Sequence, residues 1–172
     1  MSQAKSFSAR RLSLDAMMLA ASMLLSYLEG LLPLHFLPGA HLGLSHIPVM
    51  LLFVKGHRAD AAVVSLLRLC TVTLFFGGVT AFFFALCGST LSFLALLLFF
   101  RNSGRIGLSM ASASFHASGQ IFAALLIYRT QGLLFTYYPL LLLLSIPTGA
   151  LSGLLLYLIE TKGARLFENR TL

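Results

Sequence analysis

Long apolar runs separated by short polar segments dominate the pattern of this chain between residues 14 and 159. Runs of this length are typical of membrane-spanning helices, since about 20 apolar residues cross a bilayer. Gly77–Gly78 and the polar stretch Arg129–Gly132 interrupt the pattern where helices would turn back. We predict six transmembrane helices, over residues 14–32, 43–54, 61–76, 79–100, 106–128 and 133–159.

The composition agrees with an integral membrane protein surrounded by a lipid bilayer. Hydrophobic residues make up 58% of the chain and charged residues 10%, which is too few charges to cover a water-soluble domain of 172 residues. We therefore expect one all-α membrane domain, residues 1–172, built as a compact bundle of the six helices. The second predicted span is the shortest of them.

The basic residues predict the orientation of this bundle. Only Arg129 lies in a segment that would face the outside. Ten lie in segments on the side of the N-terminus, namely Lys5, Arg10, Arg11, Lys55, Arg58, Arg101, Arg105, Lys162, Arg165 and Arg170. The positive-inside rule then places both termini in the cytoplasm and the protein in the cell (inner or cytoplasmic) membrane. The net charge of +7 is divided among these short segments. We therefore interpret it as a signal of membrane orientation, and we expect no nucleic-acid partner.

Arg68 is the single lysine or arginine within the predicted spans, in the run AAVVSLLRLCTVTLFF at residues 61–76. A charge at mid-membrane costs about 3 kcal/mol on insertion scales, so such a residue is expected to face a cavity, an opposite charge or a ligand. One interpretation is that Arg68 binds an anionic group such as a carboxylate or phosphate. The other is an internal salt bridge to Glu29.

Four further polar residues accompany Arg68. His116 and Gln120, spaced i, i+4, share one face of the fifth span. Glu29 ends the first span and His46 begins the second, both near the predicted outer side. We predict that all five residues line one substrate chamber open to the outside, which requires the third and fifth spans to be neighbours. The alternative is that His116 and Gln120 only form hydrogen bonds between helices.

Two other features concern the surroundings of this chamber. The segment Gly30–His41 contains Pro and Gly and is apolar, so it either folds over the outer mouth or lies among lipid headgroups. Small residues recur at Ala16-x-x-x-Ala20 and Gly149-x-x-x-Gly153, a spacing that lets helices approach closely. Such pairs serve packing within the bundle, or, for Ala16 and Ala20, docking of a partner helix.

The sequence offers little for catalysis. Its acidic residues are widely separated, so no Asp-rich motif holds Mg²⁺ and a diphosphate. It has no Gly-rich phosphate loop and no set of Ser, His and acid at a spacing suited to nucleophilic catalysis. We predict no catalytic residue, no metal site and no cofactor.

Four segments carry a resemblance to a known family. They are SYLEGLLPLHFLPGAHLGLSHIP (26–48), LLRLCTVTLFFGG (66–78), SFHASGQ (114–120) and YYP (137–139). Together they resemble the Gx transporter family, also called heptaprenyl diphosphate synthase component I. That family is similar in size and topology to the substrate-binding S components of energy-coupling-factor vitamin transporters. Ser45-His46 and Ser118 depart from the Ala-Asn pair and the Asn that are common in the family.

The resemblance implies a six-helix, S-component-like bundle that captures a small anionic, isoprenoid or vitamin-like molecule from outside. It also implies docking through the Ala16 and Ala20 face to a transmembrane T component, with ATPase subunits that supply the energy. The alternative implied by the family name is a noncatalytic membrane subunit, component I, of heptaprenyl diphosphate synthase in isoprenoid and menaquinone biosynthesis.

Overall fold

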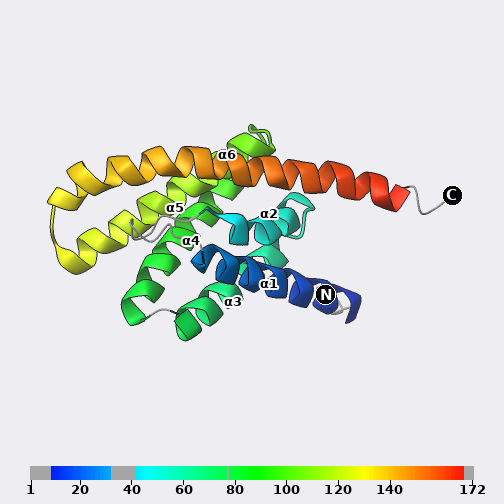
Figure 1. Ribbon diagram of the computed structural model, residues 1–172, viewed down its shortest axis with the longest axis horizontal. Helices are drawn as coiled ribbons and strands as arrows, with labels where there is room; N and C mark the ends of the chain where they lie inside the picture. The colour runs from blue at the N-terminus through cyan, green and yellow to red at the C-terminus, as the bar shows by residue number, and fades with distance from the viewer. Residues whose placement is uncertain (1–8, 32–41, 77, 169–172) are drawn as a thin grey trace, which may run out of the picture.

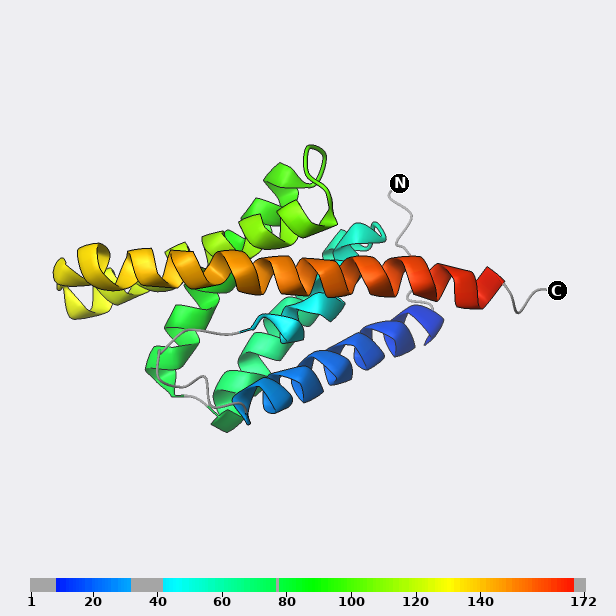
Figure 2. The same cartoon turned by 45° about the horizontal axis from the view of Figure 1, so that its top comes forward.

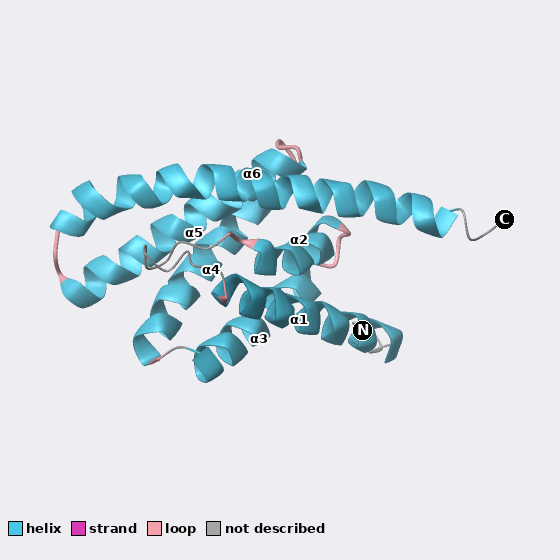
Figure 3. Ribbon diagram, in the orientation of Figure 1, coloured by secondary structure: helices cyan, strands magenta, loops and turns pink. Residues whose placement is uncertain are grey.

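The computed structural model describes residues 9–31, 42–76 and 78–168, which are helical apart from short turns (Figure 3). Within these ranges the elements are α1 (Ala9–Gly30), the 3₁₀ turn η1 (Leu44–His46), α2 (Ile47–Val54), α3 (Arg58–Phe76), α4 (Val79–Phe99), α5 (Arg105–Tyr128) and α6 (Gly132–Glu168). The all-helical prediction is therefore confirmed for this part of the chain. The largest differences in boundary are at α1, which begins before residue 14, and at α6, which continues beyond Ile159.

In the part of the chain that the structure describes, four helices are long and apolar enough to cross a membrane. They are α1, α4, α5 and α6, through the segments Arg11–Gly30, Val79–Phe99, Arg105–Tyr128 and Leu134–Lys162. The second predicted span, residues 43–54, is the shortest of the six, and the structure forms η1 and the short helix α2 there. Helix α2 has eight residues, about 12 Å at 1.5 Å per residue, against a hydrocarbon core about 30 Å thick. Helix α3, which carries Asp60 and Arg68, falls outside the four candidates.

The helices run back and forth between two ends of the molecule. The start of α1, the end of α6 and the α2–α3 and α4–α5 turns lie toward one end (Figures 1 and 2). The end of α3, the start of α4 and the α5–α6 turn lie toward the other. The segments between the helices therefore alternate between the two ends.

Helix α2 forms the centre of the larger apolar core. Val49, Met50, Leu52 and Phe53 are almost completely buried, and α2 packs against α1, α3 and α6. Figures 1 and 2 show it between α6 and α1. A short helix preceded by irregular backbone is tolerated at membrane depth where protein encloses it. The enclosure of α2 therefore explains how a half-length helix fits into the bundle.

Glycines allow the long helices to approach closely. A Cβ atom at Gly149 would lie 2.8 Å from the Cα of Met110, and one at Gly153 would lie 2.7 Å from the Cα of Ile106. The predicted pair Gly149-x-x-x-Gly153 therefore packs α6 against α5. At Gly119, an added Cβ would lie 2.5 Å from the backbone oxygen of Cys87, so α5 is equally close to α4.

Ion pairs join helices at the end that carries most of the basic residues. Arg11 donates two hydrogen bonds to Asp60, at 2.7 and 2.6 Å, and so links α1 to α3. Arg105 donates to Glu160 at 2.8 and 3.1 Å, which links α5 to α6. Asp60 and Glu160 are therefore engaged far from the predicted chamber.

Candidate substrate cavity

A cavity of about 280 Å³ lies inside the bundle, and η1 and all six α-helices contribute to its walls. Arg68, His116, Gln120, Glu29 and His46 all line it. Helices α3 and α5 are not among the closely packed helix pairs, whereas α4 packs against both. Residues of α3 and α5 therefore line the same cavity while α4 packs against both helices.

Arg68 and Glu29 are connected through a serine. The Arg68 guanidinium donates to the Ser45 hydroxyl at 2.8 Å, and this hydroxyl donates to the Glu29 carboxylate at 3.0 Å. The other carboxylate oxygen of Glu29 accepts the backbone N–H of Leu44 at 2.5 Å. No direct ion pair between Arg68 and Glu29 occurs within the described ranges. The predicted salt bridge is thus replaced by a relay that positions both charges.

Two atoms in the walls lack a hydrogen-bond partner. Arg68 Nε and Gln120 Oε1 are both buried, and neither has a partner among the residues described. A guanidinium carries five N–H donors, and among the described residues this one donates only to Ser45. Because a buried unsatisfied group costs about 1–3 kcal/mol, Arg68 and Gln120 both offer hydrogen-bonding capacity that a bound molecule can use.

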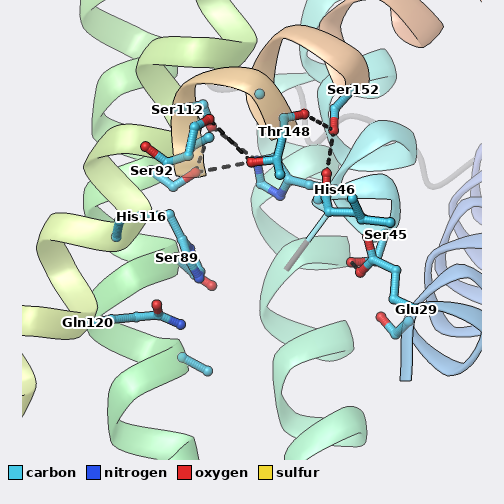
Figure 4. Close-up of a pocket in the computed structure, with 18 of the residues that line it drawn as sticks. Glu29, Ser45, His46, Ser89, Ser92, Ser112, His116, Gln120, Thr148 and Ser152 are labelled. Atoms are coloured by element: carbon cyan, nitrogen blue, oxygen red, sulfur yellow. Dashed lines mark hydrogen bonds between the residues drawn. The ribbon is translucent and has the colours of Figure 1, made fainter. Parts of the chain in front are cut away.

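His46 lies deeper in the bundle than the sequence predicted. Its Nε2 is 3.4 Å from Ser92 Oγ and 3.3 Å from Ser112 Oγ, and these two hydroxyls are 2.7 Å apart (Figure 4). Ser92 belongs to the second half of α4 and Ser112 to the first half of α5. The predicted position near the outer face is therefore wrong, because η1 carries His46 back into the bundle.

His116 and Gln120 project from the same face of α5, as their spacing predicted (Figure 4). Glycine on α4 provides the space for the imidazole ring, since a Cβ at Gly88 would lie 2.9 Å from His116 Cε1. The contact between Gly119 and Cys87 holds the two helices together beside this ring. Gly88 and Gly119 therefore allow α4 and α5 to pack closely beside the His116 ring.

Hydroxyl groups form much of the remaining wall, and the sequence analysis did not assign them to the site. The cavity-lining hydroxyl residues beyond those already named are Ser26, Thr73, Ser89, Ser109, Ser145, Thr148 and Ser152. Their spacing was a usable signal, because Ser145, Thr148 and Ser152 recur at helical intervals within an apolar run. No aromatic residue occurs among the described residues of the lining.

Two predicted features lie away from these walls. Ala16 and Ala20 are exposed on α1, outside the cavity, beside the exposed apolar side chains of Met17 and Leu24. This face is accessible to lipid or to a partner helix. The predicted cover over the outer mouth lies almost wholly in residues 32–41, outside the described residues.

Comparison with known proteins gives one result. No curated protein and no solved structure has a significant match to the chain. The family model described as heptaprenyl diphosphate synthase component I matches residues 18–159, a range that extends from α1 into α6 and includes every cavity residue named above. The chain therefore belongs to the heptaprenyl diphosphate synthase component I family.

Proposed function

We propose that this protein is the membrane substrate-binding subunit of an uptake transporter of the energy-coupling-factor type. The cavity is the observation that carries the proposal. It contains an arginine, Arg68, whose Nε atom is buried and whose described partner is a neutral serine. An arginine placed in a membrane interior marks a functional site by default, and a bound anionic substrate would supply the charge-assisted hydrogen bonds that Arg68 lacks.

The position of the cavity within the bundle supports capture from outside the cell. The ion pairs Arg11–Asp60 and Arg105–Glu160 mark the end that the positive-inside rule assigns to the cytoplasm. Glu29 lies at the opposite end of α1 from Arg11 and lines the cavity. Substrate would therefore enter the cavity from the end of α1 that carries Glu29. It would then bind Arg68, which Ser45 connects to Glu29.

Energy for transport would come from partner subunits. The exposed face of α1 around Ala16 and Ala20 combines small residues with apolar neighbours, which suits close docking of another transmembrane helix. A transmembrane T component is the partner we propose for this face. ATP would be hydrolysed by ATPase subunits attached to that component.

The family description favours a second candidate function. Under it, the chain is a noncatalytic membrane subunit of a heptaprenyl diphosphate synthase, and the cavity contributes to binding or stability of the assembly. The two candidates differ in their partners, because one requires a T component with ATPases and the other requires a soluble synthase subunit with Asp-rich motifs.

Co-purification from native membranes separates the two candidates. We expect the tagged full-length chain to retain a T component and ATPases, and Ala16→Leu with Ala20→Leu to release them, since the larger side chains prevent close helix approach. The matched control replaces two other exposed α1 residues, Met17→Leu and Leu24→Met, which keep the size of the side chains. Retention and stimulation of a prenyl synthase in place of ATPases would contradict the transporter function.

A further inference from the structure

We infer that the molecule held in this cavity is small and bipolar, with one anionic group bound by Arg68, a second hydrogen-bonding group that reaches Gln120, and no long hydrocarbon chain. The inference rests on the proposed function in one respect, namely that the cavity holds a substrate. To the anionic group of the proposed function it adds a second polar group and a limit on size, neither of which the family description or the proposed function specifies.

The first argument is the location of the unsatisfied atoms. The described residues contain three buried side-chain atoms without a hydrogen-bond partner, and two of them, Arg68 Nε and Gln120 Oε1, belong to residues that line this cavity. Most buried polar groups in native proteins are hydrogen-bonded. Two unsatisfied atoms on residues of one cavity indicate that a bound molecule forms hydrogen bonds with both.

The two atoms belong to different walls. Arg68 belongs to α3 and donates to Ser45, which donates in turn to Glu29. Gln120 projects from α5 (Figure 4). Glu29 and Gln120 lie on opposite sides of the space drawn in Figure 4. A single molecule that satisfies both residues must therefore carry polar groups at two of its ends. The unsatisfied atom of Gln120 is the carboxamide oxygen, which accepts hydrogen bonds, so the second group of the molecule is a donor.

The second argument is the charge of the lining. Apart from the histidines, Arg68 and Glu29 are the two ionisable side chains in the described lining, and their formal charges cancel. A diphosphate carries several negative charges, and here it would meet one arginine that is already linked to a carboxylate. Like charges in a desolvated site are strongly unfavourable. The cavity therefore suits a ligand with one negative charge, or a zwitterion.

The third argument is size. A cavity of about 280 Å³ has room for on the order of 20 water-sized groups, at about 10–15 Å³ of probe volume for each. A heptaprenyl chain has more carbon atoms than that, before its diphosphate is counted. A full-length isoprenoid tail therefore does not fit inside the cavity.

The test uses substituted benzoates as probes on the full-length protein in detergent. 3-Aminobenzoate and 4-aminobenzoate carry one carboxylate and one donor at two spacings, benzoate lacks the donor, and farnesyl diphosphate represents the isoprenoid diphosphates. We expect the better aminobenzoate to bind with a Kd about tenfold lower than that of benzoate, the value of one hydrogen bond of about 1.4 kcal/mol. Gln120→Met is expected to remove this difference, and Arg68→Ala to remove binding of all benzoates.

The results distinguish the inference from the proposed function. Arg68-dependent binding of farnesyl diphosphate, or equal binding of benzoate and both aminobenzoates, overturns the bipolar class and leaves the cavity as a binding site. Binding of no probe, together with no small molecule retained by the purified protein, overturns both. Preference for an aminobenzoate that survives in Gln120→Met also overturns the assignment of the second group to Gln120.

Discussion

Replacing Gln120 by methionine is expected to make the ligand-free protein more stable. Gln120 Oε1 is buried on the cavity wall without a partner among the described residues. Methionine has nearly the same length and volume as glutamine, so the substitution removes the unsatisfied amide and leaves no large void. An unsatisfied buried group costs about 1–3 kcal/mol, and for a protein of this size each kcal/mol shifts Tm by about 2–4 °C. The expected rise in Tm is therefore about 2–12 °C.

The assay has to avoid tryptophan fluorescence, because the chain contains no tryptophan. Aliquots of the purified full-length protein are heated, cooled and analysed by size-exclusion chromatography, and the loss of the monodisperse peak defines Tm. Gln131→Met is the matched control, since Gln131 is exposed in the α5–α6 turn and its replacement is expected to change Tm by less than about 1 °C.

The opposite interpretation of Gln120 gives the opposite sign. If the amide joins α5 to another helix by a hydrogen bond, methionine removes a contact worth about 0.6–1.7 kcal/mol in membrane bundles and Tm falls by a few degrees. A fall in Tm, or an unchanged Tm, would therefore refute the interpretation that Gln120 Oε1 has no hydrogen-bond partner in the ligand-free protein.

Two further predictions concern contacts between helices, one made by packing and one by an ion pair. Gly119→Ala places a Cβ 2.5 Å from the backbone oxygen of Cys87 and is expected to destabilise by about 1–3 kcal/mol through overpacking. Gly107→Ala in the same helix meets its nearest atom at 3.6 Å and is expected to stabilise by about 0.5–1 kcal/mol through helix propensity, so equal effects on Tm would contradict the close α4–α5 contact. Asp60→Asn removes the bidentate partner of Arg11 and is expected to lower Tm, with a difference from wild type that shrinks as NaCl rises; a salt-independent difference would argue against a charge effect.

The helices were predictable because apolar runs and glycines mark them directly in the sequence. The boundaries of α3, α4 and α5 agree closely with the predicted spans. Helix α6 continues beyond Ile159 because the following residues still favour helix although they are more polar, and hydropathy alone does not report this. Helix α2 was predicted as short, but its complete enclosure by protein depends on contacts that a local pattern does not contain.

The convergence of the polar residues was only partly predictable. Arg68 was identified because a charged residue within an apolar run has a high free-energy cost in a membrane. The i, i+4 spacing placed His116 and Gln120 on one helix face. The Ser45 relay between Arg68 and Glu29 was not predictable, because a charge pair in sequence does not show which small hydroxyl will lie between the charges. The depth of His46 was missed for the related reason that topology alone does not show a segment folding back into the bundle.

Native mass spectrometry of the purified full-length protein tests the central claim most directly. The wild type, and the control Arg101→Ala at the exposed α4–α5 turn, are expected to retain a small molecule at stoichiometric occupancy. Arg68→Ala is expected to lose that molecule while remaining monodisperse in size-exclusion chromatography, because the anionic group loses its charge-assisted hydrogen bonds. Retention of the same molecule at the same occupancy by Arg68→Ala would contradict the account of this cavity as an arginine-based substrate site.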